Sequence, residues 1–166
     1  LVQERNSLAT LEMVYKLGKL EGEKDSLRFL NFLAYQGIPY KAAKTLEKEM
    51  AAGHIDKSKE NLDRLASFWQ QAKELDDSIV AYQKSYAMSP SAKSQIQIAR
   101  LMIQSKHYSQ AAKFTQSVAP GANTKQKAEL AYIRGMAYFE LNQPDNALKA
   151  MKSAAQSPDI KAMANP

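Results

Sequence analysis

Apolar residues recur at helical spacing through most of the chain, and glycine or proline interrupts them at intervals. The stretch AYIRGMAYFELNQPDNALKAM, residues 131–151, has the apolar spacing of a helix, yet it contains Gly135 and Pro144. Inside a helix these residues cost about 1 and about 3 kcal/mol relative to Ala. Pro144 is tolerated where it begins a second helix, because first-turn amides have no partner within the helix. The stretch is therefore predicted to form a helical hairpin.

The other prolines divide into the same two groups. Pro90, Pro120 and Pro158 follow apolar-periodic segments that end in YAMS, QSVA and AAQS, so they are predicted to lie just beyond helix ends. Pro39 precedes the helical pattern YKAAKTLEKEM, as Pro144 precedes DNALKAMKSAA. These positions divide the chain into segments of about helix length.

A fixed internal offset recurs about every 34 residues. One series of positions, spaced by 36, 33 and 36 residues, consists of Leu30, Ala66, Ala99 and Gly135. Twelve residues beyond them lie Ala42, Ser78, Ala111 and Ala147, and three residues beyond them lie Leu33, Trp69, Met102 and Tyr138. Small side chains at an offset of twelve allow two antiparallel helices to cross closely, with a large side chain filling the space beside them. We expect Gly135 to face Ala147 across such a crossing.

These signals predict one all-α domain, 1–166, built as a solenoid of antiparallel helix–turn–helix repeats. Leu8, Leu11 and Tyr15 mark a lone helix over 5–18, which we interpret as the second helix of a preceding repeat. The predicted hairpins cover 23–52, 58–89, 92–118 and 125–157, and the tail covers 158–166 and is expected to begin a capping helix. The ends look unfinished and no Met begins the chain, so we expect a fragment of a longer protein, with flanking repeats and self-association through the open ends.

Composition narrows the functional classes. The chain is 45% hydrophobic, which is enough for a sizeable core, and it contains no run of apolar residues that would span a membrane. It has no Cys, which excludes disulfides, thiol catalysis and cysteine metal sites. The net charge is +6, but the basic residues are scattered singly, as on a solvated surface, and not clustered as in a nucleic-acid footprint.

The repeat resembles the tetratricopeptide repeat (TPR) over roughly residues 23–158. LAYIRGMAY followed by PDNALKAM, LDRLASFW followed by LDDSIVAY, and QIQIARLM followed by YSQAAKF match its order of bulky, small, aromatic and later alanine positions. Three residues depart from the pattern: Leu30 and Glu49 occupy positions where small residues are usual, and Thr115 replaces a bulky one. The resemblance implies a right-handed superhelix in which the first helix of each hairpin lines the concave face.

The resemblance therefore implies a protein-binding surface on the first helices. The predicted concave residues are Lys24, Arg28, Asn31, Tyr35, Arg64, Ser67, Gln71, Lys93, Gln97, Arg100, Tyr132, Met136 and Phe139. The early hairpins would supply a basic and polar end, and the last hairpin an aromatic and apolar end. Exposed aromatic and Met side chains are typical binding anchors, but the apolar residues of the last hairpin could equally pack against a neighbouring helix. Both interpretations stay open at this point.

Some TPR co-chaperones clamp a peptide carboxylate with Lys, Asn and Arg on successive first helices. Asn31 and Lys93 fall at matching positions, whereas Leu27, Arg64 and Gln97 replace the other members, so no such clamp is assigned. Pentatricopeptide repeats, which are hairpins of similar length that bind RNA, are the nucleic-acid alternative. The small number of Arg residues and the acidic residues expected in the groove argue against that alternative.

No catalytic, cofactor or metal site is predicted. His54 in AAGHID and His107 in SKHYS are expected to be solvated loop residues, and no metal-ligand spacing joins them. The acidic residues lie near Lys, as in EKEM (residues 47–50) and KSKEN (residues 57–61), and are expected to form ordinary surface ion pairs. The glycines are isolated, so the sequence has no phosphate-binding loop. The protein is therefore predicted not to be an enzyme.

A narrower resemblance covers residues 37–79, where GxPxKAAxxLE, AGxI and LAxxWxxAxE follow one another. This combination is similar to the periplasmic TPR proteins that accompany TonB energy-transduction systems in Gram-negative bacteria. It implies a periplasmic scaffold that binds TonB-system components and supports uptake of iron-siderophore complexes. The alternatives are an envelope TPR module that regulates a cell-wall enzyme and a generic cytoplasmic TPR adaptor. All three would bind a protein or peptide, and none would insert into a membrane or bind nucleic acid.

Overall fold

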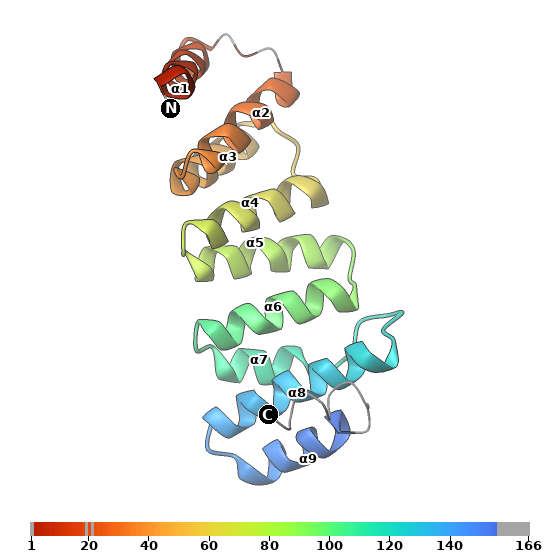
Figure 1. Cartoon of the computed structure of the whole chain (residues 1–166). Helices are drawn as coiled ribbons and strands as arrows, with labels where there is room; N and C mark the ends of the chain where they lie inside the picture. Colours follow the sequence, from red (N-terminus) through yellow and green to blue (C-terminus); the bar gives the residue numbers. More distant parts are fainter. Residues whose placement is uncertain (1, 19, 21, 156–166) are drawn as a thin grey trace. The chain divides into compact units, whose positions relative to one another are not determined.

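The computed structural model describes residues 2–18, 20 and 22–155, and all of its described regular structure is helical (Figure 1). The helices are α1 (Val2–Lys16), α2 (Gly22–Tyr35), α3 (Pro39–Ala52), α4 (Lys59–Gln71), α5 (Leu75–Met88), α6 (Ala92–Gln104), α7 (Tyr108–Phe114), α8 (Thr124–Glu140) and α9 (Pro144–Ala154). This confirms the predicted all-α fold of helix–turn–helix repeats. The predicted tail, 158–166, and the stop at Pro158 lie outside the described residues.

The chain forms two compact units, a first unit that ends at Ala81 and a second unit that begins at Tyr82, so the boundary falls within α5. In the first unit α2 packs against α3 and α3 against α4, around a core that includes Phe29, Leu46 and Trp69. In the second unit α6, α7 and α9 each pack against α8, with Ile98 and Ile133 fully buried. That the chain is a single domain stays a prediction from the sequence.

The turn inside each hairpin has the same conformation in all four hairpins. One left-handed residue follows each first helix, and its φ is 79° at Gly37, 66° at Lys73, 61° at Lys106 and 58° at Asn142. The next backbone N–H donates to the carbonyl of the large residue of the repeat: Ile38 to Leu33, Glu74 to Trp69, His107 to Met102 and Gln143 to Tyr138, at 2.8–3.0 Å. This Schellman-type ending stops the first helix and reverses the chain. The spacing of 36, 33 and 36 residues between the left-handed residues equals the spacing found in the sequence.

The helix crossings lie at the small positions that the sequence predicts. Ala42, Ala66, Ala99 and Ala111 are fully buried. In the second hairpin the Ser78 hydroxyl donates to the Ala66 carbonyl at 2.8 Å, which demonstrates a close approach at the offset of twelve.

At Gly135 the nearest neighbour differs from the expected one. A Cβ built on Gly135 would lie 2.8–2.9 Å from three atoms of the Met151 side chain, not from Ala147. The glycine therefore makes room for a long side chain from α9, one turn beyond the expected partner. Because periodicity identifies the small position but not the rotamer of the residue opposite, the sequence did not reveal this contact.

The second helix of the third hairpin is shorter than the range 92–118 predicts. Helix α7 ends at Phe114, because Thr115 turns its hydroxyl back onto the carbonyls of Ala111 and Ala112, at 2.8 and 3.2 Å. The Gln95 side chain also binds the carbonyls of Phe114 and Ser117, at 3.0 and 2.8 Å. These bonds replace the helical bonds that a further turn would have made.

Candidate protein-binding site

The first unit contains a groove of about 540 Å³ between α2 and α4, the first helices of its two hairpins. Its lining residues are Asn31, Ala34, Tyr35, Glu60, Asp63, Arg64, Ser67, Phe68 and Gln71. Five of the lining residues were predicted from the sequence to lie on the binding face, namely Asn31, Tyr35, Arg64, Ser67 and Gln71. They recur every three or four residues along each helix, so one stripe of α2 and one stripe of α4 form the two walls.

Arg64 links the two walls. Its guanidinium donates to the Asn31 side-chain oxygen at 2.9 Å and to a Glu60 carboxylate oxygen at 3.2 Å. The bond to Asn31 uses the amide oxygen, which leaves the amide N–H groups of Asn31 as donors. Arg64 therefore stiffens the groove and is itself partly shielded by its two partners.

The C-terminal ends of the two walls are neutral and exposed. The side chain of Gln71 donates to the Ser67 hydroxyl at 3.3 Å, and Ala34 and Phe68 form an apolar floor. Tyr35 is 81% exposed, which is a large aromatic surface for a residue beside a groove. Lys24 and Arg28 continue the stripe of α2 toward its N-terminus, and both are exposed. Arg28 lies 3.8 Å from Asp25, a distance typical of a weak surface ion pair.

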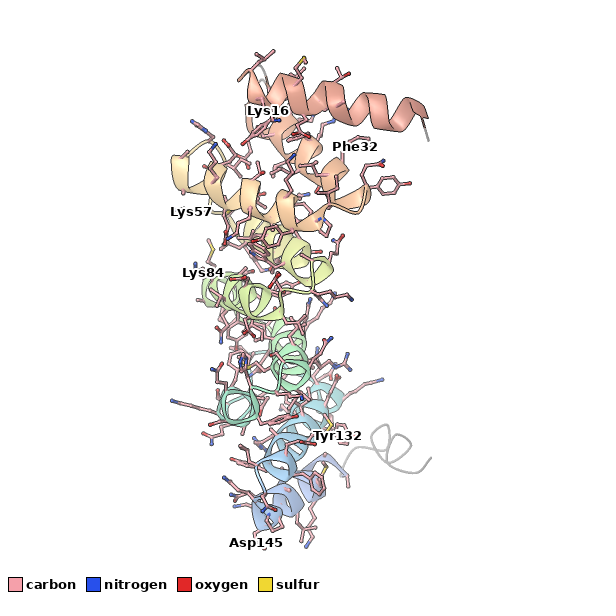
Figure 2. The ribbon with its side chains drawn as sticks, turned by 90° about the vertical axis from the view of Figure 1, so that its left-hand side faces the viewer. Lys16, Phe32, Lys57, Lys84, Tyr132 and Asp145 are labelled. Atoms are coloured by element: carbon pink, nitrogen blue, oxygen red, sulfur yellow. The ribbon has the colours of Figure 1, made fainter. Side chains whose placement is uncertain are left out.

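The predicted residues of the second unit lie on α6 and α8. Lys93 and Arg100 are exposed, Gln97 is half-buried, and Arg100 forms an ion pair with Glu129 across the two helices. The aromatic and Met residues lie in different environments. Tyr132 of α8, labelled in Figure 2, packs on Ala128, Ala131 and Ala154, and Met136 packs on the cluster of Ile96, Ala99, Leu130 and Ile133. Phe139 is 72% exposed. Only Phe139 of these three thus presents most of its surface to solvent.

A polar cluster that the sequence analysis missed lies where α1, α3 and the following loop meet. Glu49 is nearly buried, and its carboxylate accepts a hydrogen bond from the Tyr15 hydroxyl at 2.6 Å and lies 2.8 Å from His54 Nδ1. The expectation that Glu49 forms a surface ion pair was therefore wrong. The signal was present, since Glu49 occupies a position where the repeat takes a small residue.

The side chains of both histidines make contacts that the sequence did not suggest. His54 is 70% exposed, as expected for a loop residue, but it is paired with Glu49. His107 is half-buried, and its Nδ1 lies 3.2 Å from the Ser105 hydroxyl. Each histidine therefore contributes to a turn or a loop ending.

The titration of the cluster follows from its contacts. Burial alone would raise the pKa of Glu49, but the hydrogen bonds from Tyr15 and His54 outweigh it, so the pKa lies below its ordinary value. Burial, reinforced by the bond to Glu49, raises the pKa of Tyr15 well above that of a free tyrosine. At neutral pH the cluster is thus a phenol that donates to a carboxylate.

Two further findings bear on the chemistry of the surface. Among the described residues, no His, Cys, Asp and Glu side chains gather in a group of three or more that could hold a metal ion. In the part of the chain that the structure describes, no helix is long and apolar enough to cross a membrane.

The architecture is similar to that of solved structures of MamA, a TPR-like helical protein. MamA of strain AMB-1 matches with a TM-score of 0.68 at 14% identity, covering 99% of this chain and 89% of that one. Another MamA structure matches with a TM-score of 0.63 at 17% identity, covering 99% and 87%. MamA of Desulfovibrio magneticus RS-1, from residue 41 to its end, gives 0.59 at 18% identity, covering 80% and 73%. No protein-family model and no curated protein sequence matches the chain. These similarities establish a TPR-like helical fold.

Proposed function

We propose that this chain is a non-enzymatic scaffold that binds another protein through the groove between α2 and α4. The observation that supports this function best is the arrangement of the groove itself. Arg64 bonds Asn31 on one wall and Glu60 on the other, while Tyr35 stays exposed beside them. Tyr and Arg are the residues most enriched where binding energy concentrates in interfaces.

An extended segment of the partner fits this arrangement. The amide N–H groups of Asn31 and the amide oxygen of Gln71 are available to main-chain groups, and Tyr35 offers its ring to an apolar side chain. Lys24 and Arg28 would then attract acidic residues of the same segment. About 10 Å separates Arg28 from Tyr35 along the helix axis, which corresponds to about three residues of an extended chain.

At a finer level, we propose that the partner belongs to a TonB-type system and that the protein works in the periplasm. The support is the resemblance of residues 37–79 to the periplasmic TPR proteins of such systems. In the structure this stretch covers α3 and α4 and the loop between them, so it includes one wall of the groove. A scaffold of this kind would assist uptake of iron-siderophore complexes.

The binding surface is tested by affinity capture from an envelope extract. We expect Lys24→Glu with Arg28→Glu, on the α2 stripe of the groove, to weaken capture at moderate salt while helicity stays unchanged. Lys84→Glu with Lys149→Glu is the matched control, since it makes the same charge change on exposed lysines elsewhere. Full capture by the variant with Glu at both positions of α2 would exclude these basic residues from the binding site. The identity of the captured protein separates a TonB component from a cell-wall enzyme.

The cellular role is tested by deletion of the gene. We expect poor growth when a siderophore complex is the sole iron source, and we expect the protein in the periplasmic fraction. Wild-type growth, together with recovery of the protein from the cytoplasm, would overturn the TonB assignment and leave the general scaffold.

A further inference from the structure

A second cleft lies beside the early end of α7, wholly in the second unit. Helix α7 has 7 residues, whereas α3 and α5, the second helices of the two hairpins before it, have 14 each. Beyond Phe114 the chain leaves the helical path, and Ser117 of the following loop lines the cleft together with residues of α5, α6 and α7. The cleft has a volume of about 480 Å³, within the usual range for a ligand site.

The floor of the cleft is rigid because Gln95 is fully bonded. This side chain is 1% exposed, and its amide donates to the carbonyls of Phe114 and Ser117 and accepts from the Ala119 N–H at 2.9 Å. Met102, also 1% exposed, lines the cleft from the same helix. A floor with its polar atoms satisfied and an apolar residue next to them does not need water for its own hydrogen bonds.

The walls combine aromatic rings with neutral amides. Tyr86 of α5 and Phe114 of α7 meet edge to face, with ring centroids 5.4 Å apart. Gln83 and Gln110 add side-chain amides from the same two helices. Burial raises the pKa of Tyr86, so its hydroxyl remains a neutral donor at physiological pH. These walls suit an apolar side chain whose main-chain groups bond the amides.

The cleft also carries a positive charge. Lys113 lines it from the last turn of α7, and among the lining residues no acidic side chain accompanies it. Lys113 is exposed, and the part of the chain that the structure describes gives it no ion pair. Its natural complement is a carboxylate.

We propose that the cleft between α5 and α7 binds a short segment of a partner protein in which an apolar side chain lies next to a carboxylate. The apolar side chain packs against the pair of rings that Tyr86 and Phe114 form above Met102, and the carboxylate meets Lys113. The Gln83 and Gln110 amides bond the main chain of the segment. This site is separate from the α2–α4 groove, and the two proposals can fail independently.

The proposal is tested by NMR on the whole chain, labelled at its Met methyl groups and side-chain amides. The probe is the peptide acetyl-Gly-Leu-Asp-Gly-amide. Two comparison peptides lack one feature each: acetyl-Gly-Leu-Asn-Gly-amide lacks the charge, and acetyl-Gly-Gly-Asp-Gly-amide lacks the apolar side chain. We expect the first peptide to shift the signals of Met102, Gln83 and Gln110 and to bind roughly five to tenfold more tightly than either comparison peptide.

Lys113→Gln is the decisive variant, because it removes the charge at an exposed position. It should bring the affinities for the Asp and Asn peptides within about twofold of each other. Lys84→Gln, on the exposed surface of α5 (Figure 2), is the matched control and should keep the wild-type preference. An unchanged preference in Lys113→Gln, or no shift at Met102 up to a peptide concentration on the order of 5 mM, would overturn the site. Shifts confined to Asn31 and Gln71 would place the peptide in the first unit and would also overturn it.

Discussion

Consecutive hairpins are joined by loops, and the loop after α3 in the first unit is fixed by different chemistry from the loop after α7 in the second unit. In the first unit, the loop after α3 is held by two carboxylates. Glu49 contacts His54, and Glu23 accepts from the buried Asn61 amide at 2.7 Å, which in turn donates to the Asp56 carbonyl at 2.9 Å. This loop is therefore held by carboxylates that accept hydrogen bonds.

In the second unit, the loop after α7 is held by neutral groups and an arginine. The Gln95 amide bonds three backbone groups, the Thr115 hydroxyl caps α7, and Arg134 donates to the Thr115 carbonyl at 2.8 Å. None of these groups titrates at ordinary pH. The repeat thus fixes the positions of the helices but leaves each loop to its own polar contacts, so the units should differ in their sensitivity to acid and to packing changes.

The largest effect is expected from Gln95→Leu in the second unit. The Leu side chain has a volume similar to that of Gln, but it leaves the Phe114 and Ser117 carbonyls and the Ala119 N–H without their hydrogen-bond partner. Each buried group left unbonded costs about 1–3 kcal/mol, and partial access of water lowers the sum, so we expect a loss of about 3 kcal/mol. Urea unfolding checks the value. Gln104→Leu, at an exposed position of the same helix, is the control and should be nearly neutral.

Overpacking of the α8–α9 crossing should have the next largest effect. Gly135→Leu forces its side chain into the space of Met151, and we expect a loss of about 1–3 kcal/mol in thermal unfolding. The double variant Gly135→Leu with Met151→Ala should recover part of this loss, because it vacates that space. A melting temperature unchanged by Gly135→Leu alone would mean that the helices do not meet there, and no recovery in the double variant would exclude Met151 as the neighbour.

The periodicity of the sequence predicted where α8 and α9 cross better than it predicted which side chains touch at the crossing. The spacing of Leu30, Ala66, Ala99 and Gly135 correctly identified positions that are buried. Pro39 and Pro144 begin α3 and α9 and Pro90 follows α5, as predicted, whereas Pro120 lies six residues beyond the end of α7 and not just beyond it. The partner of Gly135 and the end of α7 depend on one rotamer and one hydroxyl, which leave no period in the sequence. Likewise the α2–α4 groove follows from helical spacing, but the bond between Arg64 and Asn31 joins residues 33 apart and needed the structure.

For Glu49→Ala, the sequence pattern and the structure predict opposite effects on stability. Ala is the size that the repeat favours at this position, so the pattern alone predicts a neutral or favourable change. The structure predicts a loss of about 1 kcal/mol, because Tyr15 and His54 lose their acceptor. Urea unfolding of Glu49→Ala, Tyr15→Phe and the double variant measures the coupling. Strictly additive effects would mean that the bond between Glu49 and Tyr15 contributes nothing.

The same contacts predict that the first unit is the more sensitive to acid. The pKa of Glu49 lies below its unfolded value, so its stabilisation is complete above the unfolded pKa and is lost as pH falls through the folded pKa. We expect amide exchange in residues 49–56 to accelerate as pH drops below about 4.5, once the intrinsic pH dependence is corrected for. Residues 115–119 should show no such change. Equal acceleration in both loops would remove the distinction between the two units.

The smallest effect should be shared by both units, because it concerns the turn that they have in common. Lys73 and Lys106 have φ values of 66° and 61°, a conformation that strains any residue with a Cβ. Glycine relieves that strain but makes the unfolded chain more flexible, so we expect Lys73→Gly and Lys106→Gly each to stabilise by roughly 0.5 kcal/mol. Asn142→Gly is the control, since Asn adopts this conformation more readily and should gain less. Thermal unfolding compares the three variants, and a gain at Lys73 without one at Lys106 would show that even this turn is not equivalent in the two units.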